Sequence, residues 1–398
     1  MVRARFRDYN PAMMHSVYQH INRRRLLDTA ERLIAVHSPT GAAGAACDCL
    51  ADILTREGFS VERVAAGHAA APAVVVRHSS GKPGKTLQFN GHLDTVHLPF
   101  VPPRVEGNLL CGSGASDMKA GTAAAVEALR VVRETDNLQG GAILLTAHDL
   151  HEAPWGFGQQ LDQMIRAGIV GDAVLLPEPL SDRLPIAGRG AATWKVTVRR
   201  EGPPVHEVMR PADAPDVLAA GAELVRRLGD MAARLRRVAD PVVGPASVFI
   251  GQIHGGEIYN QYAQQCWVEG TRRWLPGTSR IDVETEFREL LVELEWATNT
   301  TMRCDFQFIR DAFALHPQDR LVLAFQTAYA AMAGQPLALG PKPFVDDGNS
   351  FSALAGIPAI THGPKAGGQH TVNEWVDVDD LVRVAQVYAL TAVSYCAE

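Results

Sequence analysis

Histidines and carboxylates follow several apolar runs of this sequence, which is a pattern typical of metal sites. His92 and Asp94 end a run predicted as a strand over residues 86–90, and their i, i+2 spacing points both side chains to one side. Further candidates of the same kinds are Asp117, the cluster His148-Asp149-Leu150-His151-Glu152, Glu178 between two prolines, and His370. A mixture of imidazole and carboxylate suits zinc or a similar transition metal.

The residues of these motifs exclude two other interpretations, a phosphate-binding loop and an HExxH zinc motif. The loop 112–119 is rich in glycine, but Asp117 stands where a GxGxxG phosphate loop has its third glycine, and no P-loop Lys-Ser/Thr pair follows. The run that begins at His151 is not HExxH, because Trp155 occupies the place of the second histidine. Each motif alone is weak evidence, and only their joint occurrence indicates a site.

The apolar periodicity predicts an α/β domain that positions these residues. Helices are predicted over 24–36, 46–57 and 120–133, and strands over 73–77, 86–90 and 142–147. This alternation implies a largely parallel sheet covered by helices, and such sheets bind ligands at the loops that follow their strands.

After residue 190 the pattern changes, which predicts a second domain inserted into the first. The order over residues 191–308 is strand, helix, strand, strand, helix, strand, the split βαβ arrangement. Helices over 318–333 and 379–394 then resume the first domain. We therefore expect a catalytic domain of residues 1–190 and 309–398, and an inserted domain of residues 191–308.

Composition excludes several classes of protein. The chain has 398 residues with 46% apolar content, enough for more than one core, and its net charge of −6 leaves no basic field for nucleic acid or an anionic membrane. No apolar run approaches the roughly 20 residues of a membrane helix, and residues 1–20 lack the apolar region of a signal peptide. The six sparse cysteines indicate a reducing compartment. We expect a cytoplasmic protein with a small-molecule substrate.

The motifs, taken in order, resemble a known family. They are SPTG at 38–41, GHLDTV at 91–96, GSGASDMKAG at 112–121, PEP at 177–179, GGEIYNQ at 255–261, RWLPG at 273–277, DGN at 347–349 and GQHTVNEWV at 368–376. The sequence resembles the dinuclear zinc metallopeptidase and aminoacylase family, which includes acetylornithine deacetylase, succinyl-diaminopimelate desuccinylase, glutamate carboxypeptidase and aminoacylase-1. The resemblance implies a zinc-exopeptidase-like mixed sheet covered by helices, with an inserted βαββαβ ferredoxin-like lid and dimerisation domain.

The resemblance also implies a metal site. His92, Asp117 and Glu178 would hold one ion, and Asp117 would bridge to a second ion held by Glu152 and His370. One or two divalent ions, Zn, Mn or Co, are expected. Asp94 would not bind an ion itself but would contact His92 and orient its ring.

Residues of the inserted domain would complete the site. By the resemblance, His206 would stabilise the developing oxyanion, and Asn260 and Arg273 would contact the substrate. The same domain would pair two chains into a homodimer or a higher homo-oligomer.

One position departs from the family's pattern. Where the family has two consecutive glutamates, a general base and then a metal ligand, this chain has His151-Glu152. This alignment makes His151 the base, and we prefer it because it keeps a ligand; histidine, with a pKa near 6.5, suits the role. An ungapped alignment would instead make Asp149 the base, and a third would make Glu152 the base of a one-metal site.

The sequence therefore predicts a metal-dependent hydrolase of a C–N bond, with metal-bound hydroxide as the nucleophile. The expected substrate is a small carboxylate-bearing N-acyl amino acid or peptide-like amide. One alternative is a hydrolytic deaminase (aminohydrolase) of an aromatic amino acid such as a nitroanthranilate, on whose ring Trp155 would stack. The other alternative is a catalytically inactive member of the family.

Overall fold

The computed structural model describes residues 11–397, and the chain divides into two compact units. The first unit extends to residue 186 and resumes over 315–340 and from 350 onward, and the second comprises residues 187–314 and 341–349. The segment 341–349, which the sequence analysis assigned to the catalytic domain, is thus grouped with the second unit. The argument against a signal peptide rests partly on residues 1–10, which lie outside the described range.

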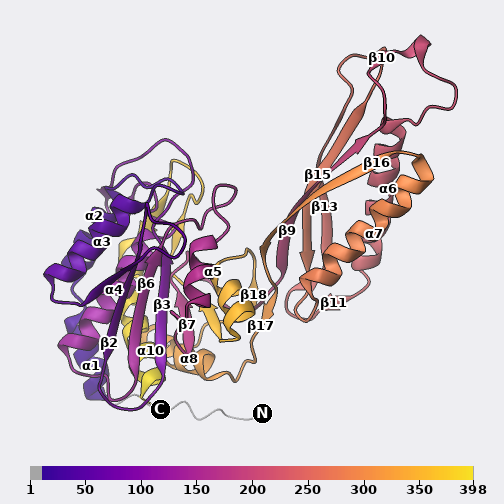
Figure 1. Ribbon diagram of the computed structural model, residues 1–398. Helices are drawn as coiled ribbons and strands as arrows, with labels where there is room; N and C mark the ends of the chain where they lie inside the picture. The colour runs from indigo at the N-terminus through magenta and orange to yellow at the C-terminus, as the bar shows by residue number, and fades with distance from the viewer. Residues whose placement is uncertain (1–10, 398) are drawn as a thin grey trace. The chain divides into compact units, whose positions relative to one another are not determined.

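A six-stranded mixed sheet forms the centre of the first unit (Figure 1). Its order is β1-β2-β6-β3-β7-β19; the last four strands are mutually parallel, and β2 runs antiparallel to both of its neighbours, β1 and β6. The strands are β1 (Val61–Val64), β2 (Ala73–Ser79), β3 (Thr86–His92), β6 (Ala142–His148), β7 (Ala173–Leu176) and β19 (Ala359–Thr361). Every residue of β6 and β7 is buried, which explains why these strands are continuous apolar runs without alternation.

Helices cover both faces of this sheet, so the predicted α/β class is confirmed. Tyr388 contacts Phe89 of β3 on one face. On the other face Leu161 packs with Val174, which is in register with Gln88 and so points away from Phe89. The helices of this unit are α1 (Pro11–His20), α2 (Arg23–Ile34), α3 (Gly44–Arg56), α4 (Lys119–Glu134), α5 (Gln159–Arg166), α8 (Arg320–Ala333) and α10 (Val378–Cys396). The short α9 (Asp347–Ser350) falls mostly within residues 341–349 of the second unit, and the turn Phe351–Ala355 follows it.

Two small sheets pair segments that are far apart in the sequence. In one, of order β20-β21-β5-β4, β21 pairs with β5, so that Trp375 lies opposite Cys111. This pairing brings the segment before Trp375 beside the glycine-rich loop that begins at Gly112. The strands of the small sheets are β4 (Arg104–Glu106), β5 (Leu109–Cys111), β20 (Ala366–Gly367) and β21 (Trp375–Asp377) in this one, and β8 (Leu184–Gly188), β17 (Phe313–Ala314) and β18 (Leu339–Lys342) in a three-stranded one.

The second unit is built on a four-stranded antiparallel sheet of order β13-β15-β9-β16. Its main elements follow the order βαββαβ: β9 (Gly190–Arg199), α6 (Val217–Leu235), β13 (Ser247–Gly255), β15 (Gln265–Trp274), α7 (Arg280–Thr298) and β16 (Thr301–Arg310). Short pairs of strands flank them, β10 (Val205–His206) with β14 (Gln261–Tyr262) and β11 (Ala239–Asp240) with β12 (Gly244–Pro245). Trp194 and Phe287 lie in the core between sheet and helices.

Candidate metal centre

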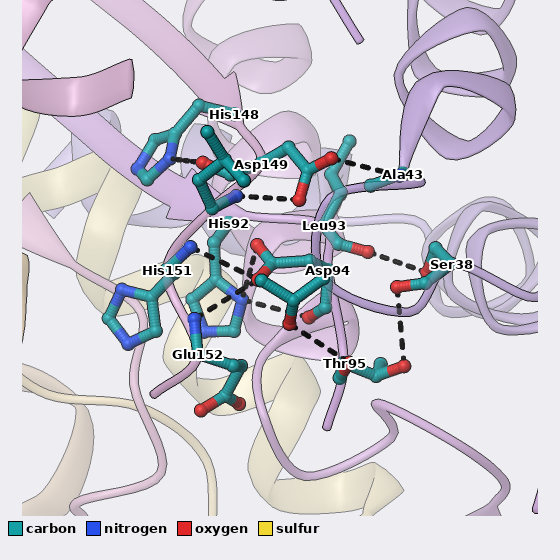
Figure 2. A network of polar contacts seen from close by, with 12 residues as sticks. Ser38, Ala43, His92, Leu93, Asp94, Thr95, His148, Asp149, His151 and Glu152 are labelled. Carbon is teal, nitrogen blue, oxygen red and sulfur yellow. Dashed lines mark hydrogen bonds and ion pairs between the residues drawn. The ribbon is translucent and has the colours of Figure 1, made fainter. Parts of the chain in front are cut away.

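His92 and Asp94 lie at the end of β3, where Asp94 makes two different kinds of contact (Figure 2). The backbone carbonyl of Asp94 lies 3.0 Å from Nδ1 of His92, and the nearer carboxylate oxygen lies 3.6 Å away. The other carboxylate oxygen accepts the backbone N–H groups of His151 at 3.0 Å and Glu152 at 3.1 Å. Asp94 therefore fixes both the ring of His92 and the loop after β6.

The five predicted ligands gather at the ends of the parallel strands. Nε2 of His92 lies 3.1 Å from Asp117 and 3.7 Å from Glu178. His370, which has a φ of 57°, approaches from the other side, with Nε2 3.5 Å from Asp117 and 3.2 Å from Glu152. Asp117 thus lies between the two imidazoles, as a bridging ligand would.

His151, at the position that departs from the family's pattern, also faces this cluster. Its ring stacks on that of His92 with centroids 4.0 Å apart and an interplanar angle of 4°. Its Nε2 lies 3.7 Å from Oε1 of Glu178. Two groups of potential ligand atoms, each mutually within 4.8 Å, therefore share His92: His92, His151 and Glu178, and His92, Asp117 and Glu152.

The charges of the cluster suit a divalent cation. Burial by itself would lower the pKa of His92, but the hydrogen bond to Asp117 and the charges of Asp94 and Glu178 raise it well above its ordinary value. Hydrogen bonds to Asp117 and Glu152 raise the pKa of His370 to about 10. Imidazole and carboxylate donors that converge in a largely buried site fit zinc, manganese or cobalt.

Glu374 belongs to this site, and the sequence analysis did not single it out. One of its carboxylate oxygens accepts the backbone N–H groups of Ser116 at 3.1 Å and Asp117 at 3.2 Å. Burial, followed by the charge of Asp117, raises the pKa of Glu374 to about 7. The only sequence signal for this role was its place four residues after His370, within the motif GQHTVNEWV.

Comparisons with known proteins identify the family of the chain. The profile of Peptidase family M20/M25/M40 matches residues 88–394. The chain belongs to this family. It is an M20 hydrolase, which confirms the resemblance and the prediction of an enzyme.

Two curated relatives of this chain are succinyl-diaminopimelate desuccinylases. Succinyl-diaminopimelate desuccinylase of Alkalilimnicola ehrlichii is 27% identical over 390 residues, which cover 91% of this chain and 96% of the relative. The desuccinylase of Erythrobacter litoralis is 34% identical over 227 residues, 52% of this chain and 58% of the relative.

Among solved structures, aminopeptidase PepT from Bacillus cereus has a TM-score of 0.81 at 20% identity, covering 94% of this chain and 99% of its own. The di-peptidase Dug1p from Saccharomyces cerevisiae has a TM-score of 0.74 at 12% identity, covering 96% of this chain and 98% of its own. At these identities the likeness to the solved structures concerns the M20 fold.

Asp149, one candidate base, is not brought to this cluster of candidate ligands. Its buried carboxylate accepts the backbone N–H groups of Gly41 at 2.9 Å, Ala43 at 3.0 Å and Leu150 at 2.6 Å. It also lies 3.1 Å from Nε2 of His68. The chain reverses at Leu150, which has a φ of 65°, so that Asp149 and His151 point to different surroundings.

Trp155 follows Glu152 in the same turn, since its backbone N–H donates to the carbonyl of Glu152 at 3.1 Å. Its ring stacks on His97 with centroids 4.3 Å apart, and the residue is 42% exposed. Its role toward a substrate stays a prediction.

Of the residues predicted to act on the substrate from the second unit, His206 and Asn260 lie together and Arg273 lies on β15. Nδ2 of Asn260 lies 3.0 Å from Nε2 of the exposed His206. Arg273 lies on β15 and is partly buried; desolvation, together with the nearby charge of Arg189, lowers its pKa. The roles of these three residues in catalysis stay predictions.

Two features bear on the predicted location. Among the described residues, no helix has both the length and the apolar character that crossing a membrane requires. All six cysteines are free thiols. The cytoplasmic location stays a prediction.

Proposed function

We propose that this M20 enzyme hydrolyses the amide bond of a small carboxylate-bearing N-acyl amino acid or peptide. The observation that carries the proposal is the convergence of His92, Asp117, Glu152, Glu178 and His370 on one cluster, in which only the side chain of His370 is largely exposed. The names of its relatives, desuccinylases and peptidases, support an amide substrate.

The five residues would hold one or two divalent ions. When bound, such an ion lowers the pKa of water from 15.7 to about 7 and polarises a carbonyl. The protein's own contribution is to hold the ligands in place through Asp94 and Glu374 and to keep the cluster largely buried.

A proton must pass from the attacking water to the departing nitrogen. Of the three candidates from the sequence, Asp149 already accepts hydrogen bonds away from the cluster. His151 and Glu152 both reach the cluster, so the proton acceptor in this proposal is one of these two.

The second unit would contribute recognition of the substrate. His206 and Asn260 would meet the oxygen on which negative charge develops, and Arg273 would bind the substrate's carboxylate. The neighbouring charges of Arg189 and Arg273 support an anionic ligand, because a carboxylate would offset their repulsion.

A substrate panel tests this proposal. We expect hydrolysis of an N-succinyl or N-acyl amino acid or of a dipeptide, loss of that activity in a chelator, and recovery with Zn²⁺, Mn²⁺ or Co²⁺. Asp117→Asn should lose most of the activity because Asp117 contacts both imidazoles. Full activity in metal-free protein would overturn the proposal.

A second candidate function is hydrolytic removal of an amino group from an aromatic acid. The observation that favours it is the exposed ring of Trp155, next to the cluster in the chain and stacked on His97. The same panel should include aminobenzoates with electron-withdrawing groups. Release of ammonia from an aminobenzoate without turnover of any amide would replace the amidase proposal with this one, and binding of metal without turnover of either class would indicate an inactive relative.

A further inference from the structure

We propose that His151 is a metal ligand, and that together with His92 and Glu178 it forms a three-residue ion site in this chain. The inference rests on the proposed metal-dependent function and assigns within it a ligand that the resemblance does not supply. It differs from the prediction made from the sequence, in which His151 takes the proton.

The distances between the donor atoms support this assignment. Nε2 of His92 and Nε2 of His151 each lie 3.7 Å from Oε1 of Glu178, and the three ligand atoms lie within 4.8 Å of one another. Ligands about 2.0–2.2 Å from one tetrahedral ion lie about 3.3–3.6 Å apart. The three donor atoms are therefore within reach of a common ion once the two stacked imidazole rings tilt so that both Nε2 lone pairs point at it.

One residue, Asp94, contacts both the ring of His92 and the backbone of His151. The carbonyl of Asp94 lies 3.0 Å from Nδ1 of His92, and its carboxylate accepts the backbone N–H of His151 at 3.0 Å. A ligand whose orientation is fixed by such outer contacts loses little freedom when the ion binds. The two rings stack in parallel at 4.0 Å, so binding of a shared ion should tilt them toward each other and break this stacking.

Two imidazoles and one carboxylate are a donor set of catalytic zinc sites, which keep a fourth position open. The set carries one negative charge against the two positive charges of the ion. Asp117, Glu152 and His370 then form a second group, joined by contacts of 3.5 Å and 3.2 Å to His370. The first group does not need the second in order to bind an ion.

This assignment also decides between the two proton acceptors. A ring nitrogen that donates its lone pair to a metal cannot accept a proton, so Nε2 of His151 is excluded from that role. The carboxylate of Glu152, largely buried and 3.2 Å from His370, then remains to accept it.

Zinc binding by matched variants tests the assignment. The wild type, His151→Ala, His151→Gln, His370→Ala and the control His97→Ala would be equilibrated in buffers of fixed free Zn²⁺, and bound zinc measured by mass spectrometry. We expect both His151 variants to bind the tightest ion about 100-fold more weakly, while His370→Ala and His97→Ala retain it. Circular dichroism checks that each variant is folded, and the glutamine variant serves if the alanine variant is not.

Absorption of the Co²⁺-loaded proteins gives a readout independent of activity. Removal of the His151 ligand should change the visible spectrum of the first bound equivalent, and removal of His370 should leave it as in the wild type. Wild-type zinc affinity and cobalt spectrum in both His151 variants would overturn this inference and leave the proposed function standing. A wild type that binds no divalent ion would overturn the proposed function itself.

Discussion

The carboxylate of Glu374 lies 3.2 Å from the backbone nitrogen of Asp117 and accepts its hydrogen bond. The same oxygen accepts the N–H of Ser116, so the segment that carries His370 also holds the loop that presents the central carboxylate. One buried oxygen that accepts two backbone N–H groups holds both of them in place. Glu374 therefore positions the backbone of Asp117.

This relationship predicts different effects for two substitutions of Glu374. Glu374→Ala should lower metal affinity by about 10- to 100-fold, the usual cost of removing an outer contact of a ligand. Glu374→Gln should retain most of the affinity, because its amide oxygen still accepts both N–H groups. Zinc titrations with a competing chelator measure both, and equal losses in the two variants would contradict a purely positioning role.

Asp149→Ala should destabilise the protein with little effect on chemistry. The substitution leaves the buried N–H of Ala43 and the partly buried N–H groups of Gly41 and Leu150 without their acceptor, which should cost about 3 kcal/mol of unfolding free energy. The control Asp48→Ala removes an exposed ion pair with Arg63 and should change stability by only about 0.5 kcal/mol. Urea unfolding measures both variants.

Measurement of kcat in Asp149→Ala distinguishes this structural role from a catalytic one. The folded Asp149→Ala protein should keep a kcat close to the wild-type value. A loss of kcat of about 100-fold or more at unchanged stability would instead show that Asp149 is the general base.

His362 should make the protein sensitive to acid. The residue is fully buried among Phe325, Tyr329 and Tyr388, and desolvation, followed by the charge of Arg383, lowers its pKa to about 3. The unfolded chain, with a pKa near 6.5, binds a proton below pH 6.5 that the folded chain does not bind. Stability should therefore fall as the pH drops from about 6.5 toward 3, by about 2 kcal/mol between pH 7 and pH 5 from this group.

A substitution that removes the titrating group tests this. His362→Phe should unfold with a smaller loss of stability between pH 7 and pH 5, because neither ring nitrogen has a hydrogen-bond partner among the described residues. The exposed His254 provides the control, since His254→Gln should leave the wild-type pH dependence unchanged. An unaltered pH profile in His362→Phe would exclude His362 as its source.

We expect two chains to form a homodimer by pairing along β13, an edge strand of the second unit's sheet. Within the described part of the chain, β13 pairs only with β15, and Phe249 and Ile253 on it are 63% and 56% exposed. An exposed apolar edge strand is a template for pairing with another chain. Light scattering should show a dimer that Ile253→Asp dissociates, whereas Val238→Asp, at another exposed apolar residue of the unit, leaves it intact.

Subunit mixing tests whether the dimer also shares its sites, with His206 of one chain acting in the site of the other. Inactive His206→Ala and inactive Asp117→Asn chains, once exchanged, should recover part of the activity in mixed dimers. Absence of recovery after confirmed exchange would indicate that each chain completes its own site.

The sequence by itself determined the kinds of residue in the site and their place in the fold. His92, Glu152 and Glu178 could be found because each follows an apolar run, and the ends of parallel strands meet at one edge of a sheet. The order βαββαβ in residues 191–308 could be identified for a similar reason, because the period of apolar residues reports strand or helix directly.

Only the tertiary structure decided which side chains of the loop after β6 face the cluster. Asp149 and His151 are two residues apart and equally suited to proton transfer, but the backbone reverses at Leu150 and points Asp149 toward Gly41 and Ala43. Glu374 could not be predicted from local pattern either, because its contact with Asp117 depends on the pairing of β5 with β21. Such contacts join segments more than 250 residues apart, and no periodicity within either segment encodes them.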